Sequence, residues 1–156
     1  MIITFFGHSN YLRNKSDESR VLALLESLAK MEQVDFYLGS YGQFDNFALM
    51  CARKYKEKHP GTRLFLICPY LGDWIQQRSQ EIGKYYDGSI YPNLENVTPK
   101  LAIIKRNEWM VKQSDHIITY IARHSGGAYR ALLYARKNKI PYTNLYEGKF
   151  EPVDSK

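Results

Sequence analysis

Short apolar runs alternate along the chain with longer segments in which apolar residues recur at helical spacing. The runs cover residues 2–6, 34–38, 63–68, 116–121 and 141–146, and a weaker one covers 89–91. Each run is too short for a typical helix, and most stop at a glycine, a proline or a polar cluster. The pattern therefore predicts six strands that are buried on both faces.

The intervals between the runs have the periodicity of amphipathic helices. Apolar residues recur every three or four positions after Ser16, over residues 44–55, from Thr98 to about residue 112 and after Gly127, and more weakly over 74–86. Ser16 and the Thr98-Pro99 pair are suited to open two of these helices. Strands that alternate with helices imply a parallel sheet covered on both faces. We therefore predict an α/β fold, a Rossmann-like three-layer sandwich with a mostly parallel central sheet.

Length and composition favour a single domain. The chain has 156 residues, enough for one hydrophobic core, and we assign residues 1–150 to the domain and 151–156 to a tail. No apolar stretch reaches the length of a membrane span and no signal-peptide pattern is visible. Cys51 and Cys68 show no metal-ligand spacing. We expect a cytoplasmic protein without a membrane segment, a metal or a cofactor.

The charge balance favours an anionic partner. Lysine and arginine number 22 against 16 acidic residues, a net charge of +6, and such a balance attracts nucleic acid or single phosphates. The basic residues are dispersed, with no run of five or more. Nucleic acid is therefore a possible partner but not the favoured one.

Glycine-containing loops follow three of the predicted strands. They are Gly7-His8-Ser9, then Gly39-Ser40-Tyr41-Gly42 with Asp45 three residues on, and Ser125-Gly126-Gly127. In an open α/β sheet, ligands bind beyond the carboxyl ends of the strands, and helix starts there attract anions. One such loop alone is most simply a tight turn, but three at one sheet edge favour a ligand site. None has the GxGxxG or the Walker pattern.

Two polar residues on a predicted helix add to this site. Arg106 is able to make a forked contact to a phosphate or carboxylate, and Asn107 both donates and accepts hydrogen bonds. The alternative is a solvated helix face beside Lys105 and Glu108.

These motifs together resemble the SLOG superfamily. The matching segments are Phe5-Phe6-Gly7-His8, Gly39 to Asp45, Arg106-Asn107-x-x-Met110-Val111, and Asp115 through Gly127. They look most like the small YspA/YpsA-like branch, and they are distantly similar to Lonely-Guy phosphoribohydrolases and DprA. The resemblance implies a Rossmann-like fold that recognises nucleotides or their derivatives, and related folds often build their sites across subunits, so we expect a homo-oligomer.

The resemblance to the phosphoribohydrolases is incomplete. Arg106 and Met110 match their RKxxM segment, and Gly126 and Gly127 match the paired glycines of PGGxGTxxE, but the glutamate of that motif has no counterpart here. Glycosidic cleavage needs a placed carboxylate. We therefore favour binding or sensing of a nucleotide over catalysis, with Asp45 and Arg106 as the candidate catalytic residues if the chain is an N-glycosidase or transferase. A weaker alternative is single-stranded nucleic-acid binding. The net positive charge and the 13 tyrosines favour it.

Overall fold

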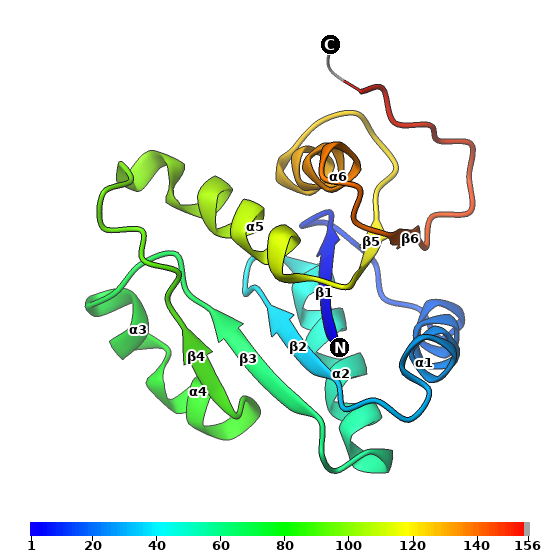
Figure 1. Ribbon diagram of the computed structural model, residues 1–156, viewed down its shortest axis with the longest axis horizontal. Coiled ribbons are helices and arrows are strands. Elements are labelled where there is room, and N and C mark those ends of the chain that lie inside the picture. The colour runs from blue at the N-terminus through cyan, green and yellow to red at the C-terminus, as the bar shows by residue number, and fades with distance from the viewer. Residues whose placement is uncertain (155–156) are drawn as a thin grey trace.

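The computed structural model, which describes residues 1–154, is built around a parallel sheet of six strands (Figure 1). The strands are β1 (Ile2–Gly7), β2 (Asp35–Leu38), β3 (Arg63–Ile67), β4 (Gly88–Ile90), β5 (His116–Tyr120) and β6 (Tyr142–Asn144). They lie in the order β4-β3-β2-β1-β5-β6, and each neighbouring pair is parallel. The predicted α/β class and Rossmann-like layered architecture are confirmed.

Helices fill the connections between the strands. They are α1 (Lys15–Ala29), α2 (Gln43–Lys58), α3 (Asp73–Gln77), α4 (Ser79–Tyr85), the 3-10 turn η1 (Pro99–Leu101), α5 (Ala102–Gln113) and α6 (Gly127–Lys137). The helix predicted over residues 74–86 is interrupted at Arg78, which separates α3 from α4.

Two helix starts differ from the sequence-based expectation. Asn14, not Ser16, caps α1, because its side-chain Oδ1 accepts a hydrogen bond of 2.7 Å from the backbone N–H of Asp17. Thr98 makes no capping hydrogen bond, and Pro99 opens a 3-10 turn so that α5 begins only at Ala102. Both shifts are local and leave the alternation of strands and helices intact.

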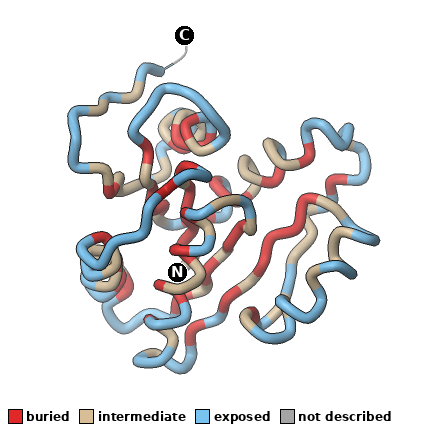
Figure 2. Tube along the Cα trace, turned by 180° about the vertical axis from the view of Figure 1, so that it is seen from behind, coloured by how far each residue is buried: buried red, intermediate tan, exposed pale blue. Residues whose placement is uncertain are grey.

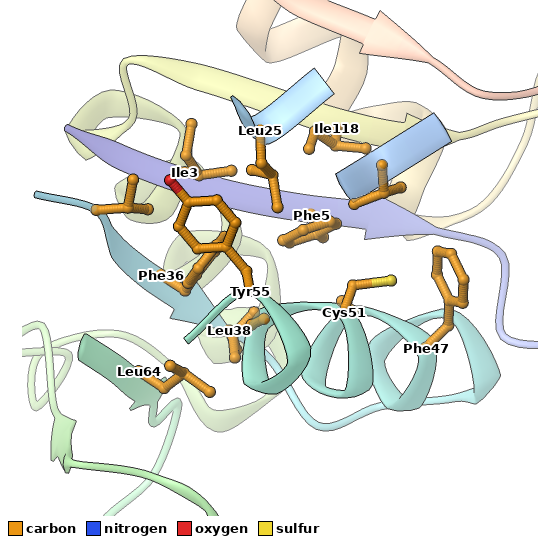
Figure 3. Packing of buried hydrophobic residues seen from close by; sticks show 14 of the residues in the cluster. Ile3, Phe5, Leu25, Phe36, Leu38, Phe47, Cys51, Tyr55, Leu64 and Ile118 are labelled. Carbon is orange, nitrogen blue, oxygen red and sulfur yellow. The ribbon is translucent and has the colours of Figure 1, made fainter. Parts of the chain in front are cut away.

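The sheet separates two hydrophobic layers. On one face, Ile3 and Phe5 of β1 pack with residues of α1 and α2 such as Leu25 and Phe47 (Figure 3). On the other face, Phe6 packs with residues of α5 and α6, among them Met110. This alternation along β1 is what a strand buried on both faces requires. Buried positions accordingly run along the central strands, and exposed ones lie on loops and outer helix faces (Figure 2).

Residues 151–154 have no regular secondary structure but contact the α6 side of the molecule. The hydroxyl of Tyr129 accepts a hydrogen bond of 3.0 Å from the backbone N–H of Val153. Arg136 of α6 pairs with Asp154, with Nε 2.7 Å from Oδ1. Within residues 1–154, the structure contains no helix long and apolar enough to cross a membrane.

The strand order places one switch point in the sheet. The chain moves from β1 outward through β2, β3 and β4, and then returns through α5 to pair β5 with the other side of β1. Folds of this kind bind ligands outside the carboxyl ends of the strands at the point where the order reverses. That point lies between β1 and β5.

Candidate ligand-binding site at the strand ends

A cavity of about 250 Å³ lies at this switch point. It is bounded by the end of β1, the loop after β2, the middle of α5 and the start of α6. Nine of the residues singled out from the sequence line it: Gly7, His8, Ser9, Gly39, Asp45, Arg106, Asn107, Gly126 and Gly127. Segments that lie far apart in sequence are thus brought to one place.

Arg106 is the most unusual residue of this cavity. It lies in the middle of α5 and is only 3% exposed, so the alternative of a solvated helix face is wrong. Its Nη1 donates to the carbonyl of Ile67 at 3.3 Å, and its Nε and Nη2 donate to Oδ1 of Asn107 at 3.2 and 2.9 Å. Within residues 1–154 no carboxylate forms an ion pair with it. A buried guanidinium therefore lines the cavity without an ion-pair contact. Burial lowers the pKa of Arg106, and the charge of Asp45 partly offsets this effect.

Asp45 brings a carboxylate to the same cavity. It is the third residue of α2, is half-buried, and its Oδ2 accepts a hydrogen bond of 2.7 Å from the backbone N–H of Tyr41. Burial raises the pKa of Asp45 to about 6, although the Tyr41 hydrogen bond and the charge of Arg106 act in the opposite direction. Asp45 therefore changes charge close to neutral pH.

Gly39 marks where this carboxylate and the arginine approach each other. A β-carbon on Gly39 would lie 3.1 Å from Oδ2 of Asp45 and 3.4 Å from Nη2 of Arg106. A side chain here would occupy the space between the two groups. The glycine thus keeps that part of the cavity open.

Glycines also begin the two helices whose starts face the strand ends. Gly42 precedes α2 and Gly126 precedes α6, with φ of 92° and 93° and ψ of 179° and 174°. This backbone region is essentially restricted to glycine. Within residues 1–154 neither helix start has a side-chain cap. At Gly126, which lines the cavity, the wall is therefore formed by backbone.

The two helix starts differ in whether their backbone N–H groups are already used. At α2, the N–H of Tyr41 donates to Asp45, and that of Gln43 donates to the carbonyl of Ser9 at 2.9 Å. At α6, in the part of the chain that the structure describes, the N–H groups of Gly127 and Ala128 have no acceptor. The first turn of α6 also lacks an acidic residue. The positive end of α6 is therefore open to an anion in the cavity.

His8 lines the cavity but already has a structural partner. Its Nε2 accepts a hydrogen bond of 2.8 Å from the backbone N–H of Ala122, and the residue is 6% exposed. Burial and the charge of Arg123 lower the pKa of His8. The ring is therefore neutral with its proton on Nδ1, and it fixes the loop after β5 against the end of β1.

Gly7 is explained by packing. A β-carbon on Gly7 would overlap the ring of Phe44, a buried residue of α2. The glycine lets this helix start lie directly against the end of β1, so its presence needs no ligand.

Three residues expected at the site do not line the cavity. Ser40 is half-buried, and its hydroxyl is enclosed without a hydrogen-bond partner among residues 1–154. Gly42 lies against Ser9, where a β-carbon would overlap the backbone. Ser125 is exposed on the loop before α6. These positions shape the loops and do not contribute lining side chains.

The structure adds lining residues that the sequence analysis missed. Tyr41 and Arg123 both line the cavity, although each lies inside or beside a motif that was identified. The guanidinium of Arg106 lies 5.4 Å from the centre of the Tyr41 ring. Trp74 donates from Nε1 to the Tyr41 hydroxyl at 3.0 Å, and Arg78 lies 4.0 Å over the Trp74 ring. An aromatic pair with an arginine at each end thus forms a rim beside the cavity.

The sheet order and this cavity define a Rossmann-like α/β domain with a positively charged pocket at its switch point. No protein-family model matches the sequence, and no curated protein sequence matches it. The fold is similar to that of DNA processing protein A from Helicobacter pylori, a single-stranded DNA-binding protein, with a TM-score of 0.59 and 16% identity. The match covers 99% of this chain and 68% of the other. At this identity the likeness shows a shared fold, and membership of the SLOG superfamily stays a prediction.

Proposed function

We propose that the chain binds a nucleotide or a nucleotide-derived small molecule, whose phosphate lies in the strand-end cavity. The observation that carries this proposal is the buried Arg106 guanidinium, which lines the cavity and has no ion-pair partner in residues 1–154. A buried charge is costly unless an opposite charge compensates it. Arg123 and the open start of α6 add positive potential beside it, so a phosphate is the fitting ligand.

The size of the cavity agrees with part of a nucleotide. Its volume of about 250 Å³ lies just below the usual range of about 300–1,000 Å³ for small-molecule sites. We therefore assign the phosphate and the sugar to it, and leave the base outside. Gly39 and Gly126 allow the ligand to approach backbone atoms closely at both ends of the cavity.

Ligand titrations with a charge-matched control test this proposal. Calorimetry with AMP, ADP-ribose, NAD and cyclic nucleotides should find at least one ligand for the wild type. Arg106→Gln should weaken its binding by about 10- to 150-fold, the equivalent of a lost charge-assisted hydrogen bond. Arg53→Gln, which removes an exposed charge outside the cavity, should bind like the wild type. If no member of the panel binds, the proposal is wrong.

The same geometry favours binding over N-glycosidic cleavage. Asp45 is the one carboxylate that lines the cavity within residues 1–154, and its Oδ2 is engaged by the loop backbone. No acidic residue stands in the first turn of α6. We therefore expect no free base to be released when the protein is incubated with nucleoside monophosphates.

Single-stranded nucleic acid is the second candidate ligand, and the rim beside the cavity favours it. Tyr41 and Trp74 are two adjacent aromatic rings with Arg106 and Arg78 close to their faces. Aromatic and arginine side chains of this kind provide stacking surfaces for unpaired bases. The net charge of +6 and a structural neighbour that binds single-stranded DNA are consistent with this candidate.

An oligonucleotide titration separates this candidate from a free nucleotide. Binding of a labelled single strand, followed by anisotropy, should weaken as salt rises. Trp74→Ala should weaken it by about 1–3 kcal/mol, the usual contribution of one stacked base. Tyr85→Ala is the control, because Tyr85 also lies close to two cations, Arg53 and Lys84, but does not belong to the rim. Equal losses in both variants would argue against the rim as the binding surface.

A further inference from the structure

We infer that the groove between α5 and α6 receives the base of the nucleotide whose phosphate lies in the strand-end cavity. This inference rests on the proposed function and extends it to the part of the ligand that determines specificity. The groove has a volume of about 550 Å³ and is lined by residues of both helices. It is distinct from the Tyr41–Trp74 rim, which contains none of its lining residues.

The groove adjoins the strand-end cavity. Ile103, Asn107 and Gly127 line both of them. Gly127 is the first residue of α6, directly beside the free backbone N–H groups proposed to hold the phosphate. A ligand whose phosphate lies at this point is therefore next to the groove, and the two volumes together reach the range of sites that enclose small molecules.

The groove differs from the cavity in the character of its walls. Ile103 and Ile104 of α5 face Ala131 and Tyr134 of α6 across it. Apolar and aromatic side chains on opposite sides suit a flat ring that is apolar on its faces. Charged side chains, among them Arg130 and Lys137, also line the groove.

Asn107 adds a polar group at the junction of the two spaces. Its Oδ1 accepts two hydrogen bonds from Arg106, and because an arginine only donates, this fixes the orientation of the amide. Its Nδ2 therefore points away from Arg106 and has no acceptor in the described part of the chain. Both N–H groups of this amide are available to an acceptor atom of a nucleobase. Every nucleobase carries such acceptors, as ring nitrogens or carbonyl oxygens.

An ion pair joins two of the residues that line the groove. Arg136 and Asp154, which line it, form an ion pair of 2.7 Å, and Arg136 also donates to the hydroxyl of Tyr142 at 2.9 Å. This contact ties the segment after β6 to α6.

Titration with ligands of increasing size tests the inference and separates it from the proposed function. Wild-type protein is titrated with inorganic phosphate, ribose 5-phosphate and AMP. We expect AMP to bind about tenfold or more tighter than ribose 5-phosphate, since only AMP carries a base. Ile104→Gln, which places a polar amide on the groove wall, should remove most of this gain and leave ribose 5-phosphate binding unchanged. Leu101→Gln is the control, because Leu101 is exposed and lies outside the groove.

Each outcome decides between the two ideas. If ribose 5-phosphate binds and AMP binds no tighter, the inference is wrong and the phosphate site stands. If AMP binds tighter but Ile104→Gln behaves like Leu101→Gln, the base lies elsewhere and the inference is again wrong. If none of the three ligands binds, the phosphate site itself fails and the inference falls with it. Circular dichroism of the variants confirms that each is folded.

Discussion

Asp45→Asn is expected to stabilise the protein at neutral pH. Asparagine keeps the shape of the side chain and an oxygen that accepts from the Tyr41 N–H, but it removes the half-buried charge. A folded-state pKa of about 6, against an ordinary value of 3.8, corresponds to a cost of about 3 kcal/mol for the ionised form, at about 1.4 kcal/mol per tenfold change in proton affinity. This is the upper limit of the gain.

The way in which wild-type stability depends on pH determines where Asp45→Asn is stabilising. Between pH 4 and 6 the folded state holds a proton that the unfolded state has lost, so wild-type stability falls as pH rises through this window. Above pH 6 the carboxylate is ionised in both states and the full cost is present. The gain from Asp45→Asn should therefore be about 1–3 kcal/mol at pH 7.5 and fall below about 1 kcal/mol at pH 4.0.

Urea unfolding at both pH values measures the difference in the free energy of unfolding. Asp73→Asn serves as the control, because Asp73 is an exposed residue in the first turn of α3. An Asp45→Asn variant that is less stable than the wild type at pH 7.5, or whose effect is the same at both pH values, would refute the reasoning. A stabilising change at a cavity residue is also typical of a site that sacrifices stability for binding.

Three further substitutions probe other parts of the site. Gly7→Ala should lower the free energy of unfolding by about 1–3 kcal/mol, because its methyl group would overlap the Phe44 ring; thermal melts that match the wild type would exclude this overlap. Gly39→Ala should weaken phosphate binding more than it affects stability, since its methyl group would lie 3.1 Å from a carboxylate oxygen of the cavity, and paired calorimetry and melting experiments would show it. His8→Ala should cost about 1–3 kcal/mol at pH 7.5, because it removes the acceptor of the Ala122 N–H. Because the pKa of His8 is lowered, the wild type loses this contribution as pH falls below about 6.5, so the difference should shrink at pH 5.

The fold was largely predictable because its signals are local. A strand such as β1 (Ile2–Gly7) is a short apolar run that ends at a glycine, and the helices follow from periodicity. The errors were at boundaries. Asn14 and Ser16 both cap helices well, and only the three-dimensional path of the chain decides between them.

The candidate site was predictable only in part. Loops after strands must meet at one sheet edge, so Gly39 and Gly126 were found from the pattern. The burial of Arg106 was not, because its neighbours Lys105 and Glu108 suggest an exposed face while α5 turns it inward. The hydrogen bond between Trp74 and Tyr41 joins residues 33 positions apart. No local pattern in the sequence predicts such a contact.

The two glycines that precede α2 and α6 have a consequence for how this pocket can vary. Because Gly42 and Gly126 adopt φ of 92° and 93°, the main chain itself sets the shape of the loop before α2 and of the pocket wall at Gly126. A single added carbon at either position opposes this shape. Replacing either glycine by alanine therefore tests the backbone directly, whereas Ser125, which is exposed, contributes no side chain to the pocket lining. A pocket built in this way depends on its glycines more than on the side chains beside them.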